Sequence, residues 1–445
     1  MDKYLELSNK YYTFIYEGYK IEENDNKTII TYDFNVPNLT HYYPKLEFNK
    51  FEITEYTKYL IFHIGLVELV SYWKATCSKN VIIKCGYLNE EQINFFKKLY
   101  FHGLGELFYT NNISVEYDNF MNITCTCSKE EIEIPNYNGL GNLIPIGGGK
   151  DSNVTLEILK STFDSNHAFI INPKEVHINC AQAADYKDDK LITVKRTIDK
   201  KLIELNNEGF INGHTPFSAL VAFITYLTAF INNKKYIVLS NESSANESNV
   251  SGTKINHQYS KTYEFENNFN NYTNKYFKTN IKYFSLLRPL SEYQIALLFS
   301  NYEKYHKVFK SCNVGSKEKP WIWCSNCPKC LFVYIILSPH LYKEKLINIF
   351  GEDLFEKEEL LTTFIELCGF GETKPFECVG TYSEVRYAIT KLINKLETLP
   401  YLLKYYKENY PLEDLTKPLE NYYNEENNLE PEFVKLLKEE LEKYV

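Results

Sequence analysis

The chain has 445 residues, enough for two or three domains, and its 44% hydrophobic and 24% charged residues are typical of a globular protein. Its formal net charge of −9 argues against general nucleic-acid binding through a basic surface. The N-terminus is polar and charged, so no signal peptide is expected. The longest apolar run, residues 217–231, is shorter than a bilayer requires and predicts a buried helix. We therefore expect a cytoplasmic protein without a membrane segment.

The first 130 residues are predicted to form a smaller α+β domain. Three short runs rich in β-branched and aromatic residues alternate with turns and predict antiparallel hairpins: residues 11–16, 28–34 and 45–48. An apolar helix is predicted over residues 55–76, and a strand at 81–85 precedes a helix that begins near Asn89. No catalytic constellation is visible in this region, so its expected role is to shape one wall of a site.

Residues 131–390 change to alternating strands and helices, which predicts an α/β domain built on a parallel sheet. Four strands are predicted: residues 143–146, 168–172, 191–194 and 236–240. Ligands of such sheets bind beyond the carboxyl ends of the strands, where the conspicuous polar motifs of this sequence fall. Residues 267–278, rich in Asn and Tyr, are predicted to form a poorly ordered loop. The charged residues 391–445 are predicted to form a helical surface appendage.

A glycine loop follows the first strand of this sheet. Its residues are Gly147, Gly148, Gly149, Lys150, Asp151 and Ser152. Glycines allow close approach of the backbone to an anion, and the free N–H groups at a helix start can hold a phosphate. The loop resembles the Ser-Gly-Gly-x-Asp-Ser motif of the PP-loop ATP pyrophosphatases, with Gly147 in place of the first serine. The alternative is an ordinary glycine turn between a strand and a helix.

Only three of the 49 basic Lys and Arg residues are arginines: Arg196, Arg288 and Arg386. This bias suggests that Arg remains where its planar guanidinium group is needed, because that group pairs with carboxylate or phosphate in a bidentate manner. We expect these side chains to bind phosphate or substrate carboxylates. Structural ion pairs are the alternative.

Four of the eleven cysteines have metal-ligand spacing: Cys312, Cys324, Cys327 and Cys330. Two tight CxxC steps can wrap a tetrahedral Zn²⁺, and four thiolates would close its coordination shell, which predicts a structural zinc site. The spacing resembles the zinc site of 7-cyano-7-deazaguanine synthase. Buried thiols around a helix start are the alternative.

Two further segments carry candidate functional groups. Pro375 and Gly380 bracket a turn in which Glu377 and Cys378 place a carboxylate beside a thiol, and these are candidate proton-transfer groups. A second turn, residues 212–216, contains His214 before the predicted buried helix. It suits either a ligand site or a capped loop.

Several stretches in the same order resemble the MurL family, the ATP-dependent UDP-MurNAc-L-alanyl-L-glutamate epimerases of peptidoglycan synthesis. They are the glycine loop and residues 212–216, 240–246, 288–295, 323–330 and 374–380, with residues 103–109 also similar. The resemblance extends from about residue 10 to 390. It implies a PP-loop domain that adenylates a glutamate carboxylate, exchanges its α-proton, and releases AMP and pyrophosphate.

The resemblance implies roles for the candidate residues. The glycine loop would hold the phosphates of ATP, and Asp151 or Glu242 would place Mg²⁺. Cys378 is the first candidate for one acid/base group, and His214, Glu242 and Glu377 compete for the second. The expected partner is a UDP-sugar dipeptide and not a nucleic acid or a membrane.

Two other classes stay open. One is a PP-loop enzyme that adenylates another small substrate, as deazaguanine synthases or tRNA-modifying enzymes do, although the acidic charge argues against tRNA. The other is a non-catalytic relative that binds a nucleotide, which the missing first serine of the loop leaves open. AMP release under turnover conditions distinguishes these classes.

Overall fold

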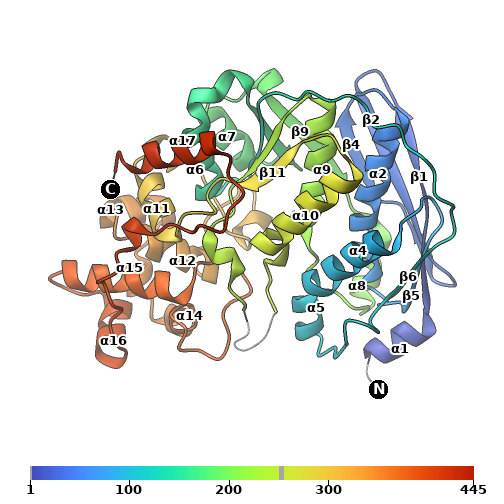
Figure 1. The fold of residues 1–445 in the computed structure, drawn as a ribbon. Helices are drawn as coiled ribbons and strands as arrows, with labels where there is room; N and C mark the ends of the chain where they lie inside the picture. The colour runs from blue at the N-terminus through green and yellow to red at the C-terminus, as the bar shows by residue number, and fades with distance from the viewer. Residues whose placement is uncertain (1–2, 250–254, 445) are drawn as a thin grey trace.

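The computed structural model describes residues 3–249 and 255–444, which fold around one sheet of eleven strands. The strand order is β11-β10-β7-β8-β9-β4-β2-β1-β5-β6, with β3 paired to β2. In Figure 1 the N-terminal segments, in blue, lie at one end of the molecule and the C-terminal helices, in orange and red, at the other. The predicted α/β class with a largely parallel sheet is confirmed.

The strands are β1 (Thr13–Glu23), β2 (Lys27–Val36), β3 (Thr40–Tyr42), β4 (Lys45–Asn49), β5 (Asn80–Ile83), β6 (Asn122–Cys125), β7 (Asn142–Pro145), β8 (His167–Ile171), β9 (Leu191–Thr197), β10 (Tyr236–Leu239) and β11 (Lys282–Ser285). The helices of the first half are α1 (Lys3–Lys10), α2 (Glu55–Glu68), α3 (Val70–Trp73), α4 (Glu90–Gly103), α5 (Gly105–Thr110), α6 (Lys150–Ile158), α7 (Glu175–Ala183), α8 (Lys200–Asn207) and α9 (Phe217–Ile231). Those of the second half are α10 (Tyr263–Tyr276), α11 (Glu292–Ser300), α12 (Pro328–Leu337), α13 (Lys343–Phe350), α14 (Leu361–Leu367), α15 (Tyr382–Lys395), α16 (Tyr401–Asn409) and α17 (Pro431–Leu441).

The N-terminal part of the sheet contains the predicted antiparallel hairpins. β1 pairs with β2 and β2 with β4, all antiparallel, whereas β5 and β6 continue from β1 in parallel. Side chains along β2 alternate between buried and half-buried, as expected for a strand with one face on a core. β4 then pairs with β9 through Leu46 and Arg196, so the N-terminal strands and the parallel strands form one continuous sheet.

The five strands β11, β10, β7, β8 and β9 are parallel. The chain passes from β7 to β8 and β9 on one side and then returns to place β10 on the other side of β7. The position between β7 and β10 is therefore a topological switch point, where ligands of open α/β sheets bind. Alternate strand residues enter two cores: Leu143 packs with the N-terminal helices, and Ile144 packs with the C-terminal ones.

The predicted buried helix at 217–231 is confirmed as α9, which packs against α2. The prediction of a poorly ordered loop at 267–278 is wrong, because most of this segment belongs to α10. Phe265, Phe269 and Tyr272 recur at helical spacing and are buried in the N-terminal core, so a narrow aromatic stripe outweighs the polar composition.

The C-terminal tail contains α16 and α17, and α17, the last helix, is packed against the sheet. Phe433 and Leu437 of α17 are buried, and the Phe433 ring lies 4.9 Å from the ring of Tyr236 on β10. The domain boundaries predicted at residues 130 and 390 stay predictions. Within residues 3–249 and 255–444, none of the helices combines the length and apolar character that a membrane crossing requires.

Candidate active site

A cavity of about 420 Å³ lies at the switch point of the sheet. Its walls include Gly147 and Asp151 after β7, and Ser240 and Glu242 after β10. Glu377 and Cys378, more than 120 residues further along the chain, form another part of the same wall. The fold thus brings together the glycine loop, the segment after β10 and the Pro-Gly turn, which were predicted separately from the sequence.

The glycine loop connects β7 to α6, as its sequence predicted. Gly148 adopts a φ of +76°, a left-handed conformation that favours glycine, and Gly149 is the N-cap residue of α6. The backbone N–H groups at this helix start are available to an anion. Lys150, however, is 2% exposed, and its ammonium forms ion pairs with Asp151 and Glu292. Its predicted contact with phosphates stays a prediction.

Cys378 lies among cationic side chains. Lys261 Nζ donates a hydrogen bond of 3.0 Å to Cys378 Sγ, and Lys329 Nζ donates one to the backbone carbonyl of Cys378. Burial opposes ionisation of the thiol, but the charge of Lys261, a hydrogen bond with His257 and the charge of Lys329 together lower the pKa of Cys378 to about 6. The sulfur is therefore a thiolate at neutral pH, able to accept a proton.

Three side chains from distant segments meet beside this thiol. Glu106 on α5 forms an ion pair with His257 Nδ1, and its Oε2 lies 3.8 Å from His214 Nδ1. The two imidazole rings are 4.2 Å apart. Burial and the charge of His257 lower the pKa of His214 to about 4, so this imidazole is neutral at pH 7. The turn containing His214 thus lies next to the wall of the site that contains Cys378.

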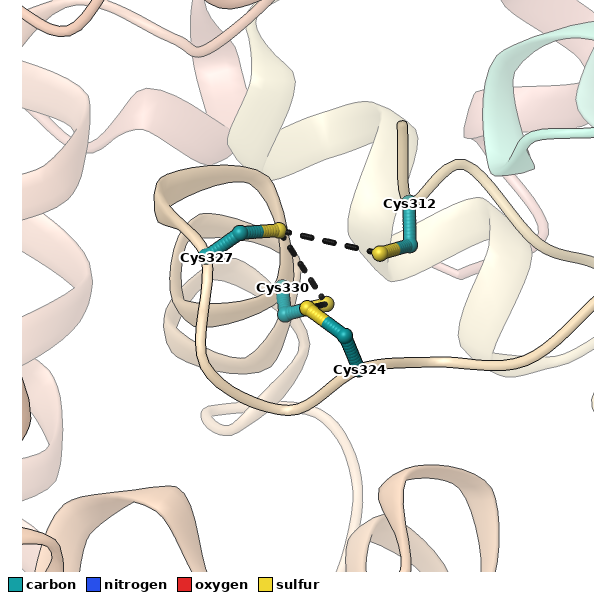
Figure 2. Close-up of side chains that lie close together, drawn as sticks. All are labelled: Cys312, Cys324, Cys327 and Cys330. Atoms are coloured by element: carbon teal, nitrogen blue, oxygen red, sulfur yellow. Dashed lines mark hydrogen bonds between the residues drawn. The ribbon is translucent and has the colours of Figure 1, made fainter. Parts of the chain in front are cut away.

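The predicted cysteine tetrad is assembled (Figure 2). Cys312 and Cys327 sulfurs are 3.7 Å apart, as are those of Cys324 and Cys330, and Cys327 and Cys330 are 3.5 Å apart. A tetrahedral Zn²⁺ with Zn–S bonds of about 2.3 Å requires sulfurs roughly 3.8 Å apart, so the four thiols fit this ion. Cys327 is the N-cap residue of α12, and Cys330 lies in its first turn, directly beside Lys329.

The three arginines are paired with carboxylates of the chain. Arg196 binds Glu68, Arg288 binds Glu266, and Arg386 binds Glu413. Arg288 is completely buried and also donates a hydrogen bond to the backbone carbonyl of Glu242, so it fixes the position of the segment after β10. These contacts correspond to the structural alternative considered for arginine retention, and binding of ligand by Arg196, Arg288 or Arg386 stays a prediction.

The sequence reasoning missed four groups of the site: Glu106, His257, Lys261 and Lys329. Lys329 lies within the CxxC step, and Glu106 lies within residues 103–109, so both belong to stretches that were already conspicuous. His257 and Lys261 belong to no recognisable motif. Their position near Cys378 depends on the packing of α10 and the segment before it.

The fold and site define an α/β protein with a ligand cavity at the switch point of a parallel sheet, an ionised thiol in its wall and a cysteine tetrad beside it. Residues 6–286 match the family model of the MurL N-terminal domain, and residues 308–406 match that of the MurL C-terminal domain. The chain therefore belongs to the MurL family.

Three relatives carry the name UDP-N-acetyl-alpha-D-muramoyl-L-alanyl-L-glutamate epimerase. The protein of Xanthomonas oryzae pv. oryzae is 33% identical over 75% of this chain and 74% of its own length. The protein of a Micromonospora species is 35% identical over 74% of this chain and 73% of its own length. That of Salinispora tropica is 33% identical over 74% of this chain and 72% of its own length. This similarity covers most of each protein.

Proposed function

We propose that this chain is an isomerase that converts the terminal L-glutamate of UDP-MurNAc-L-Ala-L-Glu to D-glutamate, using ATP, in cytoplasmic peptidoglycan precursor synthesis. Membership of the MurL family and the names of three relatives support the reaction. One observation of the site carries the mechanism: a glycine loop at a helix start and an ionised Cys378 line the same cavity. A phosphate-binding loop and a base are what an adenylation followed by proton exchange requires.

The first step overcomes the weak acidity of the glutamate α-proton. Removal of this proton while the carboxylate is ionised would place a second negative charge on the carbon next to the carboxylate. A carboxylate oxygen therefore attacks the α-phosphorus of ATP, and the bond to pyrophosphate breaks. The resulting acyl-adenylate carries no carboxylate charge, so its α-proton is acidic enough for a side-chain base.

The second step exchanges the α-proton. The Cys378 thiolate takes the proton, so an S–H bond forms and the electron pair of the C–H bond moves into the enolate of the acyl-adenylate. A proton delivered to the opposite face gives the D-configuration, and water then releases AMP. His214, Glu242 and Glu377 are the candidates for the second group, and Glu242 and Glu377 line the cavity. Lys261 and Lys329 would stabilise negative charge near Cys378.

Two metal ions belong to the proposal. Asp151 and Glu242 present carboxylates to the cavity, which suit Mg²⁺, and this ion would neutralise charge on the leaving pyrophosphate. A Zn²⁺ held by the cysteine tetrad would be structural, because four thiolates close its shell. The tetrad would then hold the start of α12 in place, and with it Lys329, whose ammonium reaches the Cys378 carbonyl.

The test is incubation of the zinc-replete protein with ATP, Mg²⁺ and UDP-MurNAc-L-Ala-L-Glu in deuterated water, followed by analysis of AMP, pyrophosphate and glutamate chirality. The expected products are AMP and glutamate of D-configuration carrying deuterium at Cα. AMP without inversion would assign the chain to the PP-loop enzymes that adenylate another substrate. Absence of AMP despite ATP binding would make it a non-catalytic nucleotide-binding relative.

A further inference from the structure

We propose that Glu106, His257 and Cys378 form a triad in which Glu106 and His257 are positioning residues that hold Cys378 as a thiolate. The inference rests on the proposed function for the use of this thiolate as the base of the epimerisation. It concerns two residues that the family resemblance and the sequence motifs did not assign. The ionic state of the thiol can be measured without any substrate, which separates this inference from the reaction itself.

The geometry of the triad comes from three segments that are far apart in the chain. The carboxylate of Glu106, on α5, holds one side of the His257 ring through Nδ1. His257 and the Cys378 thiol also interact with each other, which raises the pKa of the imidazole and lowers that of the thiol. The imidazole thus lies between a carboxylate and a thiol, in the order found wherever a carboxylate orients an imidazole toward a nucleophile or base.

Asn249 links the segment that contains His257 to the turn that contains Cys378 through hydrogen bonds. Asn249 Oδ1 accepts a hydrogen bond of 2.8 Å from the backbone N–H of His257. Its Nδ2 donates to the carbonyl of Pro375 at 3.0 Å, and its own carbonyl accepts the N–H of Lys374 at 3.1 Å. One buried amide side chain therefore sets the relative position of the imidazole and the thiol, which is the role expected of support around a preorganised site.

Charges on every side favour the ion pair of imidazolium and thiolate. Lys261 and Lys329 face Cys378, whereas Glu106 and His214 face His257. Burial lowers the pKa of His257, but its hydrogen bonds with Cys378 and Glu106 and the charges of both raise that pKa to about 9. The imidazolium and the thiolate therefore coexist over the pH range between about 6 and 9.

A metal ion is the alternative occupant of this place, because ligand atoms of Glu106, His214 and His257 lie within 4.8 Å of one another. The surrounding charges oppose a cation. The ammonium groups of Lys261 and Lys74 both act on His214, and Lys261 is hydrogen-bonded to the thiol. A protonated His257 pairs with Glu106 and leaves no lone pair for a metal. The triad therefore accounts better for the arrangement.

The experiment measures the rate of iodoacetamide alkylation of Cys378 against pH, by mass spectrometry of the peptide that contains it, in zinc-replete protein without substrate. Wild-type protein is expected to show a midpoint near pH 6. His257→Asn keeps a polar side chain but removes the cation, and should raise the midpoint by about one pH unit or more. Cys127, in a different cavity, is the internal control, and its alkylation rate should be the same in both proteins.

Glu106→Gln, which preserves the shape of the carboxylate, provides the second variant. It should lower the pH at which the His257 imidazolium loses its proton, observed as the upper inflection of the same profile, because the carboxylate no longer stabilises the cation. Under turnover, His257→Asn should lower kcat and leave the KM for ATP unchanged. Near-ultraviolet circular dichroism verifies the fold of each variant.

Two outcomes would overturn the triad. An unchanged alkylation midpoint in folded His257→Asn protein would show that the imidazole does not hold the thiolate. A divalent metal ion that is retained by wild-type protein beyond the tetrad ion, and lost in His257→Asn, would show that the cluster binds metal. If instead the midpoint shifts but no epimerisation occurs with substrate, the triad stands and the proposed function fails.

Discussion

At the scale of single residues, the site depends on an ammonium group placed beside a thiol. Lys261 is largely buried by its surroundings, and an ammonium removed from water needs an anionic partner within reach. The Cys378 sulfur, at 3.0 Å from Lys261 Nζ, is that partner. Each charge therefore stabilises the other, and this explains why a thiol in a mostly buried position can ionise at neutral pH.

Substitution of Cys378 by Ala should separate the two half-reactions. Deuterium exchange at Cα should fall by about 100-fold or more, because the base is lost, whereas pyrophosphate release should continue. In wild-type protein the exchange rate should increase as pH rises through about 6, because only the thiolate accepts a proton. Cys127→Ala, in another cavity, is the matched control. Full turnover by Cys378→Ala protein with an intact tetrad would exclude Cys378 as the base.

Two adjacent glycines of the loop should respond differently to substitution by Ala. Gly148 has a φ of +76°, and a Cβ there would lie 2.9 Å from Val176 Cγ1, so Gly148→Ala should lower the free energy of unfolding by about 1–2 kcal/mol or more. A Cβ on Gly147 would meet no atom within 4 Å, and Gly147→Ala should change stability by less than about 0.5 kcal/mol. Urea unfolding monitored by fluorescence measures both; equal effects would contradict this reading of the loop.

At the scale of secondary-structure elements, two helix starts shape the cavity. The start of α6 presents its N–H groups after the glycine loop, and the start of α12 contains Cys327 and Cys330 of the cysteine tetrad. Cys327 and Cys330 lie on either side of Lys329 in the chain. A change in the position of these cysteines would therefore also move the Lys329 ammonium, which contacts the backbone carbonyl of Cys378. The zinc ion proposed for the tetrad would thus affect the reaction without contacting the substrate.

Loss of the tetrad should therefore reduce both metal content and activity. Purified protein should hold about one zinc per chain, and Cys327→Ser protein close to none, as determined by elemental analysis. The melting temperature should decrease in the same variant, because binding of the ion contributes to folding free energy. Cys125→Ser, which changes a half-buried cysteine outside the tetrad, should keep its zinc. Zinc content that is unaffected by Cys327→Ser would exclude the tetrad as the metal site.

At the scale of the whole molecule, one sheet joins the two ends of the chain. β4 and β9 connect the N-terminal hairpins to the parallel strands, and α17 closes the opposite end by packing on β10 and β11. The cavity lies between these ends, beside β7 and β10. Its shape therefore depends on segments that contribute no residue to it.

Truncation of one buried side chain of α17 should show that the stability of the fold depends on the C-terminal tail. Phe433 is buried against Tyr236 and Phe284, so Phe433→Ala should destabilise the protein by about 3–5 kcal/mol. Lys435 on the same helix has a side chain that is 75% exposed, and Lys435→Ala should cost less than about 0.5 kcal/mol. Chemical denaturation compares the two. Equal stability of both variants would show that the tail does not belong to the cooperative fold.

Local patterns were sufficient to predict much of the fold and part of the site. The glycine loop, the buried helix α9 and the cysteine tetrad each lie within short stretches, because turns, helix starts and metal ligands have characteristic local spacing. The segment of α10 was mispredicted because its polar composition concealed a stripe of three aromatic residues. The binding of ligand by the three arginines stays a prediction. Their guanidinium groups meet Glu68, Glu266 and Glu413, which lie 128, 22 and 27 residues away, and no local pattern reveals these partners.

By itself, the sequence determined the α/β class, the glycine loop between a strand and a helix, the four cysteines and the candidacy of Cys378. These features follow from residues close to one another in the chain, where spacing alone restricts the geometry. Only the tertiary structure decided what surrounds that thiol. Glu106 and His257 are 151 residues apart and Lys261 and Cys378 are 117 apart, and they meet because the two ends of the sheet and α10 pack around one cavity. The charges that lower the pKa of this thiol come from these distant groups, and no local pattern encodes them.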